Sequence, residues 1–163
     1  MIPLSLGPGG LCVVGRNGRS AWVCARRTCV DALLARPGSA SRAFRARVRL
    51  HPELIEQILA WRGERQRRWL RTAYRSGLLV IPEPDDAELD PECDHWLTTH
   101  DHNDPTIDQN KLSKRPACTF VMAIGEADVS AIIGLRRCTL LGIRPGRATQ
   151  SLLDSLRRWD SVG

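Results

Sequence analysis

The sequence predicts a small α+β module, a hairpin with short helices, followed by an α/β domain of the α-β-α sandwich type. Three observations lead to this fold class. A turn signal separates two β-favouring runs near the N-terminus, apolar residues recur at helical spacing in the middle of the chain, and strand-like and helix-like segments alternate after residue 90. Such alternation is typical of a parallel or mixed sheet covered by helices. The two modules are predicted to span residues 1–50 and 51–163.

The first module is predicted to begin with a β-hairpin. Leu11–Val14 and Ser20–Cys24 favour strands, and Asn17-Gly18 between them signals a tight turn, because both central residues of that turn need positive φ. Apolar spacing then predicts two short helices, at Cys29–Arg36 and at Ser41–Arg49.

A longer helical region is predicted after residue 51. Pro52 suits a first helical turn, where its missing N–H would have no partner. Gly63 is expected to divide this region into two helices. The second helix carries five arginines and ends before Gly77, and residues 78–81 should form a buried strand.

The rest of the second module begins with an acidic segment. Pro82–Glu92 holds three prolines and six carboxylates in eleven residues, which predicts a loop. It is either a solvated spacer or an acidic strap that shields a basic surface. The elements expected after it are strands His95–Thr99, Cys118–Ile124 and Cys138–Ile143 and helices Pro105–Ser113, Glu126–Ile133 and Ala148–Trp159.

Charge is distributed unevenly along the chain. The net charge is +6, but residues 1–75 hold 15 basic and four acidic side chains, whereas residues 76–163 hold nine basic and 14 acidic ones. Every basic residue of the first part is arginine, whose planar fork suits phosphate. This asymmetry indicates an N-terminal surface that faces a polyanion. The alternative is a GC-rich genome, which enriches arginine without any ligand.

Several classes of protein are excluded by composition and motifs. No run approaches the roughly 18 apolar residues of a membrane span, and the N-terminal residues do not resemble a secretory signal. We therefore expect a cytoplasmic protein with reduced cysteines. The sequence has no nucleophile elbow, phosphate-binding loop or dinucleotide fingerprint, so we expect neither enzymatic activity nor a cofactor.

Arginines and one tryptophan are the candidate nucleic-acid ligands. Guanidinium groups hold phosphates and an aromatic ring stacks on bases, although Trp22 suits the small core equally well. The expected RNA-binding residues are Arg16, Arg19, Trp22, Arg26, Arg27, Arg42, Arg45 and Arg47. A second candidate set is Arg68, Arg71 and Arg75.

The N-terminal part of the chain resembles the YlxR family of small bacterial proteins. The family carries a Gly-Arg-Gly-Ala-Tyr/Trp-Val-Cys segment, a later cysteine and a Lys-Arg-Ala-Phe-x-Arg-Ala segment, and the counterparts here are Gly18–Cys24, Cys29 and Ser41–Arg47. The resemblance covers about residues 11–50. It implies a basic RNA-binding face and a place near the transcription and translation machinery. The family's opening Arg-x-Cys-x-x-Cys strand is matched here by Cys12 alone.

The second module resembles the kink-turn-binding ribosomal-protein superfamily more weakly. The similar segments are Trp69–Val80, His95–Leu112 and Ile124–Gly142. The resemblance implies an α-β-α sandwich, and fusions of such a domain behind a YlxR-like unit are known. The superfamily's Gly-x-Asn-Glu signature should fall near residues 82–88, where this chain is acidic, so the fold is expected without that RNA site.

Cysteines and histidines offer two candidate zinc sites, although we expect no metal. The first set is Cys93, His95, His100 and His102, whose spacing matches no standard zinc motif. The second pairs Cys24 with Cys29, with Cys12 or another residue completing it. Cysteines packed as small apolar residues are the alternative.

Together these features predict a non-enzymatic protein that binds structured RNA of the transcription or translation machinery. Two other classes remain open. One is an adaptor whose acidic residues 76–163 bind a partner protein, and the other is a zinc-dependent enzyme built on the first zinc set.

Overall fold

The computed structural model describes residues 1–82, 90–99, 119–122, 124–134 and 140–160. It is a mixed α/β structure with two small sheets, consistent with the predicted α+β class. Contacts divide it into a first unit, Met1–Arg62 with Arg158–Gly163, and a second unit, Gly63–Arg157. The first unit thus extends beyond the boundary predicted at residue 50. Among the helices described, none has the length and apolar character needed to cross a membrane.

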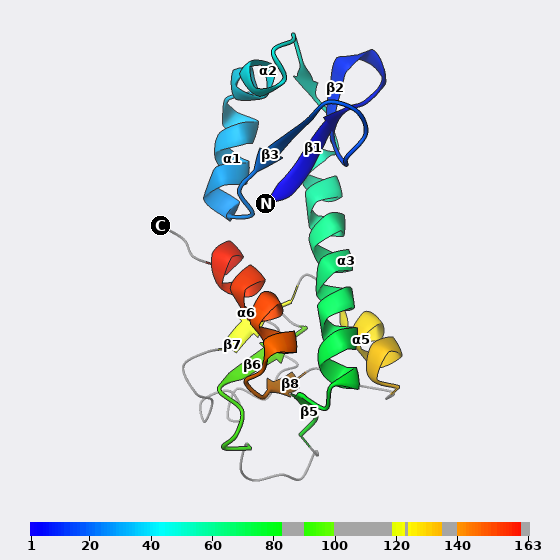
Figure 1. Cartoon of the computed structure of the whole chain (residues 1–163), viewed down its shortest axis with the longest axis vertical. Coiled ribbons are helices and arrows are strands. Elements are labelled where there is room, and N and C mark those ends of the chain that lie inside the picture. The colour runs from blue at the N-terminus through cyan, green and yellow to red at the C-terminus, as the bar shows by residue number, and fades with distance from the viewer. Residues whose placement is uncertain (83–89, 100–118, 123, 135–139, 161–163) are drawn as a thin grey trace, which may run out of the picture. The chain divides into compact units, whose positions relative to one another are not determined.

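The first unit contains a four-stranded sheet in the order β3-β1-β2-β4 (Figure 1). β1 is antiparallel to both of its neighbours, and β4 runs parallel to β2. The strands are β1 (Ile2–Leu6), β2 (Leu11–Val14), β3 (Ser20–Val23) and β4 (Arg49–Leu50), and the helices of this unit are α1 (Arg27–Ala35), α2 (Gly38–Phe44) and the beginning of α3 (Leu54–Arg75).

The predicted hairpin between β2 and β3 is wrong, because β1 lies between these two strands. Leu4 of β1 pairs with Val14 on one side and with Ala21 on the other. β1 escaped prediction because Pro3 argues against a central strand. Pro3 is the second residue of β1, near its end, where the loss of one ladder hydrogen bond is tolerated.

One face of this sheet, which we call the inner face, packs against the helices. Ile2 and Leu4 alternate to this face and are buried together with Val30 of α1, Phe44 of α2 and Leu54 of α3. Because side chains alternate along a strand, the residues between them belong to the opposite face, which we call the outer face.

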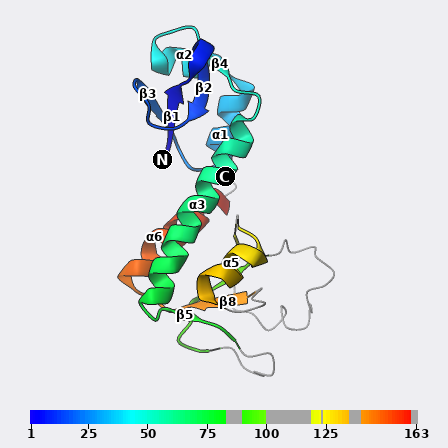
Figure 2. The ribbon, with the colours of Figure 1, turned by 90° about the vertical axis from the view of Figure 1, so that its right-hand side faces the viewer.

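α3 is one continuous helix, so the break predicted at Gly63 is wrong (Figure 2). A glycine inside a helix costs only about 1 kcal/mol relative to alanine. Buried residues on both sides of it, Ile58 and Leu70, provide enough packing to carry the helix through.

The second unit contains a mixed sheet in the order β5-β8-β6-β7, as expected from the alternating pattern. β6 and β7 are parallel, and the other neighbours are antiparallel. The elements are β5 (Leu79–Val80), β6 (His95–Thr98), β7 (Thr119–Val121), α5 (Glu126–Ile133), β8 (Leu140–Ile143) and α6 (Arg147–Asp160). The predicted helix Glu126–Ile133 is confirmed, and the one predicted at Pro105–Ser113 lies outside the described residues.

The described helices of the second unit pack on one face of its sheet. Leu97 and Leu141 are paired across β6 and β8 and point to the same face. They share a core with Leu70 of α3, Val129 of α5 and Leu152 of α6. The other helical layer of the predicted sandwich depends on residues outside the described ranges.

Candidate nucleic-acid interface

The arginines of the first unit that precede α3 are all exposed, including every arginine predicted there to bind RNA. Among the described residues, Arg27 is the one of these arginines that forms an ion pair, and its partner is Asp31 at 3.9 Å. Both of those side chains are well exposed, so the pair contributes little. The set is Arg16, Arg19, Arg26, Arg27, Arg36, Arg42, Arg45, Arg47 and Arg49, and we call it the exposed arginine set.

Trp22 lies at the surface and is not part of the small core. The side chain is 47% exposed on β3, an edge strand, and lies opposite Pro3 on the outer face. The guanidinium of Arg16 lies over its ring, 4.9 Å from the ring centroid. One face of the indole therefore already receives a flat cationic group.

A hollow at the other edge of the sheet brings two arginines together. It has a volume of about 370 Å³ and is lined by Gly9, Gly10, Arg47 and Arg49. Both glycines have positive φ (69° and 72°), a conformation that favours glycine and leaves the hollow free of side chains on that side. Two cations beside bare backbone suit an oxyanion such as phosphate.

Arg49 was missed as a candidate from the sequence. It pairs with Leu11, whereas its neighbour Leu50 pairs with Cys12 of the inner face. Arg49 therefore points to the outer face, as Trp22 does. The direction of Arg49 follows from the parallel pairing of β4 with β2. The sequence of a two-residue strand does not reveal such a pairing.

Arg45 occupies an unusual backbone position at the end of α2. Among the described residues, Arg45 is the one non-glycine residue with positive φ (51°). Its N–H donates to the carbonyl oxygens of Arg42 and Ser41. Helices commonly end in this left-handed conformation at glycine, because a Cβ is disfavoured there. Arg45 is thus an exposed arginine in a backbone conformation where glycine is usual.

The second candidate set, on α3, is also exposed. Arg68, Arg71 and Arg75 belong to the second unit and follow helical spacing along one side of α3. Their neighbour Arg67 makes a two-pronged contact with Asp128 of α5, Nε to Oδ1 at 3.0 Å and Nη2 to Oδ2 at 2.8 Å. The Arg67 hydrogen bond is the main cause that lowers the pKa of Asp128, and Arg71 adds to the effect.

The described end of the acidic segment, Asp90–Glu92, forms ion pairs within the second unit. Arg144 contacts Asp90 at 2.9 Å and Glu92 at 3.1 Å. The Glu92 backbone N–H and the Arg144 guanidinium both lower the pKa of Asp90. These two carboxylates thus neutralise a second-unit arginine, while residues 83–89 of the segment lie outside the described ranges.

The first zinc set is not assembled by its described members. His95 pairs with Ile143 on the helix-covered face, whereas Cys93 lies against the opposite side of Gly142, beside Trp96. Burial raises the pKa of the Cys93 thiol to about 11, which disfavours the thiolate that zinc binds. His100 and His102 lie outside the described residues.

The cysteines of the first unit do not form a metal site either, as far as the structure describes the chain. Cys12 is buried on the inner face, and burial raises its pKa. Cys24 and Cys29 are half-buried. The described ranges contain no group of three or more side chains placed to hold a metal ion.

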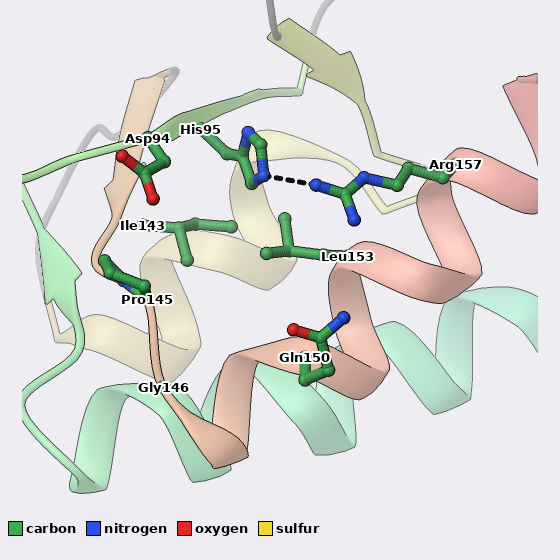
Figure 3. Close-up of a pocket in the computed structure, with 8 residues that line it drawn as sticks. All are labelled: Asp94, His95, Ile143, Pro145, Gly146, Gln150, Leu153 and Arg157. Atoms are coloured by element: carbon green, nitrogen blue, oxygen red, sulfur yellow. Dashed lines mark hydrogen bonds between the residues drawn. The ribbon is translucent and has the colours of Figure 1, made fainter.

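A small notch lies in the second unit between β6, β8 and α6 (Figure 3). It has a volume of about 140 Å³, with Ile143 and Leu153 as apolar lining and Asp94, His95 and Arg157 among its polar groups. The Arg157 guanidinium donates to His95 Nε2 at 2.7 Å. Burial and Arg157 lower the pKa of His95, so the imidazole is neutral and already engaged as an acceptor.

Comparison with known proteins adds no relative. A scan against protein-family models, a search of curated proteins and a search of solved structures found no match to this chain. The features of the chain that bear on its function are therefore the exposed arginine set, Trp22 and the hollow lined by Arg47 and Arg49.

Proposed function

We propose that the chain is a cytoplasmic, non-enzymatic RNA-binding protein whose first unit holds phosphates through the exposed arginine set. The observation that carries this proposal is the near absence of ion pairs in that set among the described residues. Guanidinium groups that have no carboxylate partner keep their donors available for a phosphate backbone. In this proposal the first unit is a YlxR-like module, and its ligand is structured RNA of the transcription or translation machinery.

The placement of the arginines supports a ligand over a compositional origin. A GC-rich genome would enrich arginine in both units alike, and both units do hold eleven arginines. The units differ in their carboxylates, with which Arg67 and Arg144 of the second unit are paired. The first unit has few acidic residues, so its positive potential is not cancelled locally and attracts polyanions over about a Debye length, roughly 8 Å at physiological salt.

The second unit is proposed to be an α-β-α sandwich of the kink-turn-binding type, with a supporting role. Arg68, Arg71 and Arg75 give it a second basic surface. The adaptor alternative needs free carboxylates, and among the described ones Asp90, Glu92 and Asp128 are engaged by arginines of the same unit. These three pairs favour RNA binding over the adaptor, which stays the second candidate function.

A pair of matched charge reversals tests the proposal. In the full chain, Arg19, Arg42 and Arg45 are changed together to Glu, and the control carries Arg68→Glu, Arg71→Glu and Arg75→Glu. Both variants change the net charge equally. Retention of total cellular RNA on a filter at about 150 mM salt should be abolished in the first variant, because several phosphate contacts are lost and replaced by repulsion. The control should lose clearly less binding, because Arg68, Arg71 and Arg75 form only the secondary candidate set.

Each possible result of this experiment has a defined meaning. Unchanged retention in the first variant would remove the role assigned to these arginines. Equal losses in both variants would show that net charge alone drives binding and would contradict a site in the first unit. Circular dichroism and thermal melting check that both variants are folded, which we expect because all six side chains are exposed.

A further inference from the structure

The outer face of the first sheet has chemistry that goes beyond phosphate binding. Its two edge strands carry different groups: β3 presents Trp22, and β4 presents Arg49. The helices of the first unit pack against the inner face, and on the outer face Trp22 and Arg49 are exposed, whereas Pro3 and Ser5 of the central strand β1 are buried. An aromatic ring and a cationic hollow on one sheet face form a surface that can contact both bases and backbone.

We propose that this outer face binds an unpaired, single-stranded segment of RNA, with one base stacked on Trp22 and a phosphate held between Arg47 and Arg49. The inference rests on the proposed function and specifies its ligand. Base pairing buries both flat faces of a base in the duplex stack, so a surface aromatic ring reaches only unpaired bases. Arginines alone would not make this distinction, because phosphates are present in both forms.

The surroundings of Trp22 favour flat stacking on its ring. At 47% exposure, this large side chain leaves much of its apolar surface in water. Arg16 already places a planar guanidinium 4.9 Å from the ring centroid. A nucleobase can make the same flat contact, and Arg16, on the exposed loop before β3, can then pair with the neighbouring phosphate.

The register of the sheet gives the scale of the bound segment. Trp22 lies opposite Pro3, the Gly15 N–H donates to the Pro3 carbonyl, and Arg49 lies opposite Leu11. The two groups are thus three strand spacings apart across the sheet and four residues apart along it, on the order of 20 Å in total. A short run of extended nucleotides bridges such a distance, whereas one nucleotide does not.

The test compares single-stranded and duplex RNA with the full chain and its Trp22 variants. The probes are an unstructured oligoribonucleotide of about 12 nucleotides, within the usual range of site sizes, and a blunt duplex of the same length. Trp22→Ala should weaken binding of the single strand about tenfold and change binding of the duplex less than twofold. Trp22→Phe keeps a stacking ring and should retain most of the affinity for the single strand.

Failure of this inference can be distinguished from failure of the proposed function. If the wild-type chain binds both probes and Trp22→Ala weakens neither, or weakens both equally, single-strand recognition is wrong and phosphate binding stands. If the wild-type chain binds neither probe, the proposed function fails, and this inference fails with it. Trp22→Phe is also the check on stacking: if both variants keep the wild-type melting temperature and lose single-strand binding equally, a stacking role for Trp22 is refuted.

Discussion

The two units use arginine in different ways. In the second unit, Arg67 ties α3 to α5 through Asp128, and Arg144 holds Asp90 and Glu92. In the first unit, the exposed arginine set makes a single weak pair among the described residues. A guanidinium paired with a carboxylate stabilises a fold, whereas one that faces solvent offers its donors to a ligand. Arg67 and Arg144 therefore have a structural role, whereas the exposed arginine set, like Arg68, Arg71 and Arg75 of the second unit, can offer its donors to a ligand.

Two of the tryptophans, Trp96 and Trp22, differ in a similar way. Trp96 of β6 is fully buried, and its ring lies so close to Gly142 that a Cβ at that position would be 3.1 Å from it. Trp22 is half exposed on an edge strand. The first ring stabilises a core, and the second contributes little to one, which is why we assign it to a ligand.

The largest expected effect is on RNA affinity and on its dependence on salt concentration. Replacing Arg47 and Arg49 together with Ala should lower RNA affinity about tenfold and make the slope of log affinity against log salt shallower by about 0.7, because the one phosphate that they hold is no longer neutralised and its counterions are no longer released on binding. Fluorescence anisotropy from about 50 to 200 mM salt measures both. The matched control, Arg68→Ala with Arg71→Ala, should leave the slope nearly unchanged. An unchanged slope in the first variant would show that no phosphate occupies the hollow.

A smaller effect tests the structural role of a paired arginine. Arg67→Ala should lower the free energy of unfolding by about 1 kcal/mol, since its ion pair is two-pronged but partly exposed, and should leave RNA affinity unchanged. Arg42→Ala should show the opposite pattern, with weaker RNA binding and unchanged stability. Urea unfolding and anisotropy give the two values for each variant. Identical behaviour of the two variants would remove the distinction between the units.

The difference in unfolding free energy between the wild-type chain and Arg67→Ala should depend on pH, because Asp128 titrates. Its folded-state pKa is lowered, so the pair stabilises the fold fully above the ordinary aspartate pKa, and the contribution is lost as the pH falls through the lowered value. The wild-type chain and Arg67→Ala should therefore converge in unfolding free energy under acidic conditions. A difference that persists there would mean that Arg67 acts through packing instead of charge.

The sequence predicted the locally determined parts of the fold. α5 begins and ends as expected because its apolar period is regular and Gly134 supplies the left-handed C-cap (φ 77°). β1 was missed because it pairs with β2 on one side and with β3 on the other. The turn signal at Asn17-Gly18 suggested instead that β2 and β3 pair directly. Gly63 was misjudged because packing on both sides of a helix outweighs one unfavourable residue.

The candidate site was predicted only in its residue types. Arginine-rich composition identified seven of the nine members of the exposed arginine set, but not Arg36 or Arg49. The direction of Arg49 depends on a long-range parallel pairing. Exposure of Trp22 also depends on which strand forms the sheet edge, and the mistaken hairpin gave it a different set of neighbours. Side-chain direction at a sheet edge is thus set by tertiary pairing, beyond the reach of local patterns.

The smallest predicted effect separates function from stability at one residue. Arg45 holds a left-handed conformation (φ 51°) that disfavours a Cβ. Arg45→Gly should therefore raise the free energy of unfolding by about 0.5–1 kcal/mol, after the entropic penalty of glycine in the unfolded chain, while RNA affinity falls severalfold. Arg45→Ala is the matched control, because it removes the same guanidinium but keeps the Cβ. It should lose RNA affinity equally without any gain in stability. If Arg45→Gly were more stable and bound RNA as tightly as the wild-type chain, this arginine would have no part in the interface, and its strained position would need another explanation.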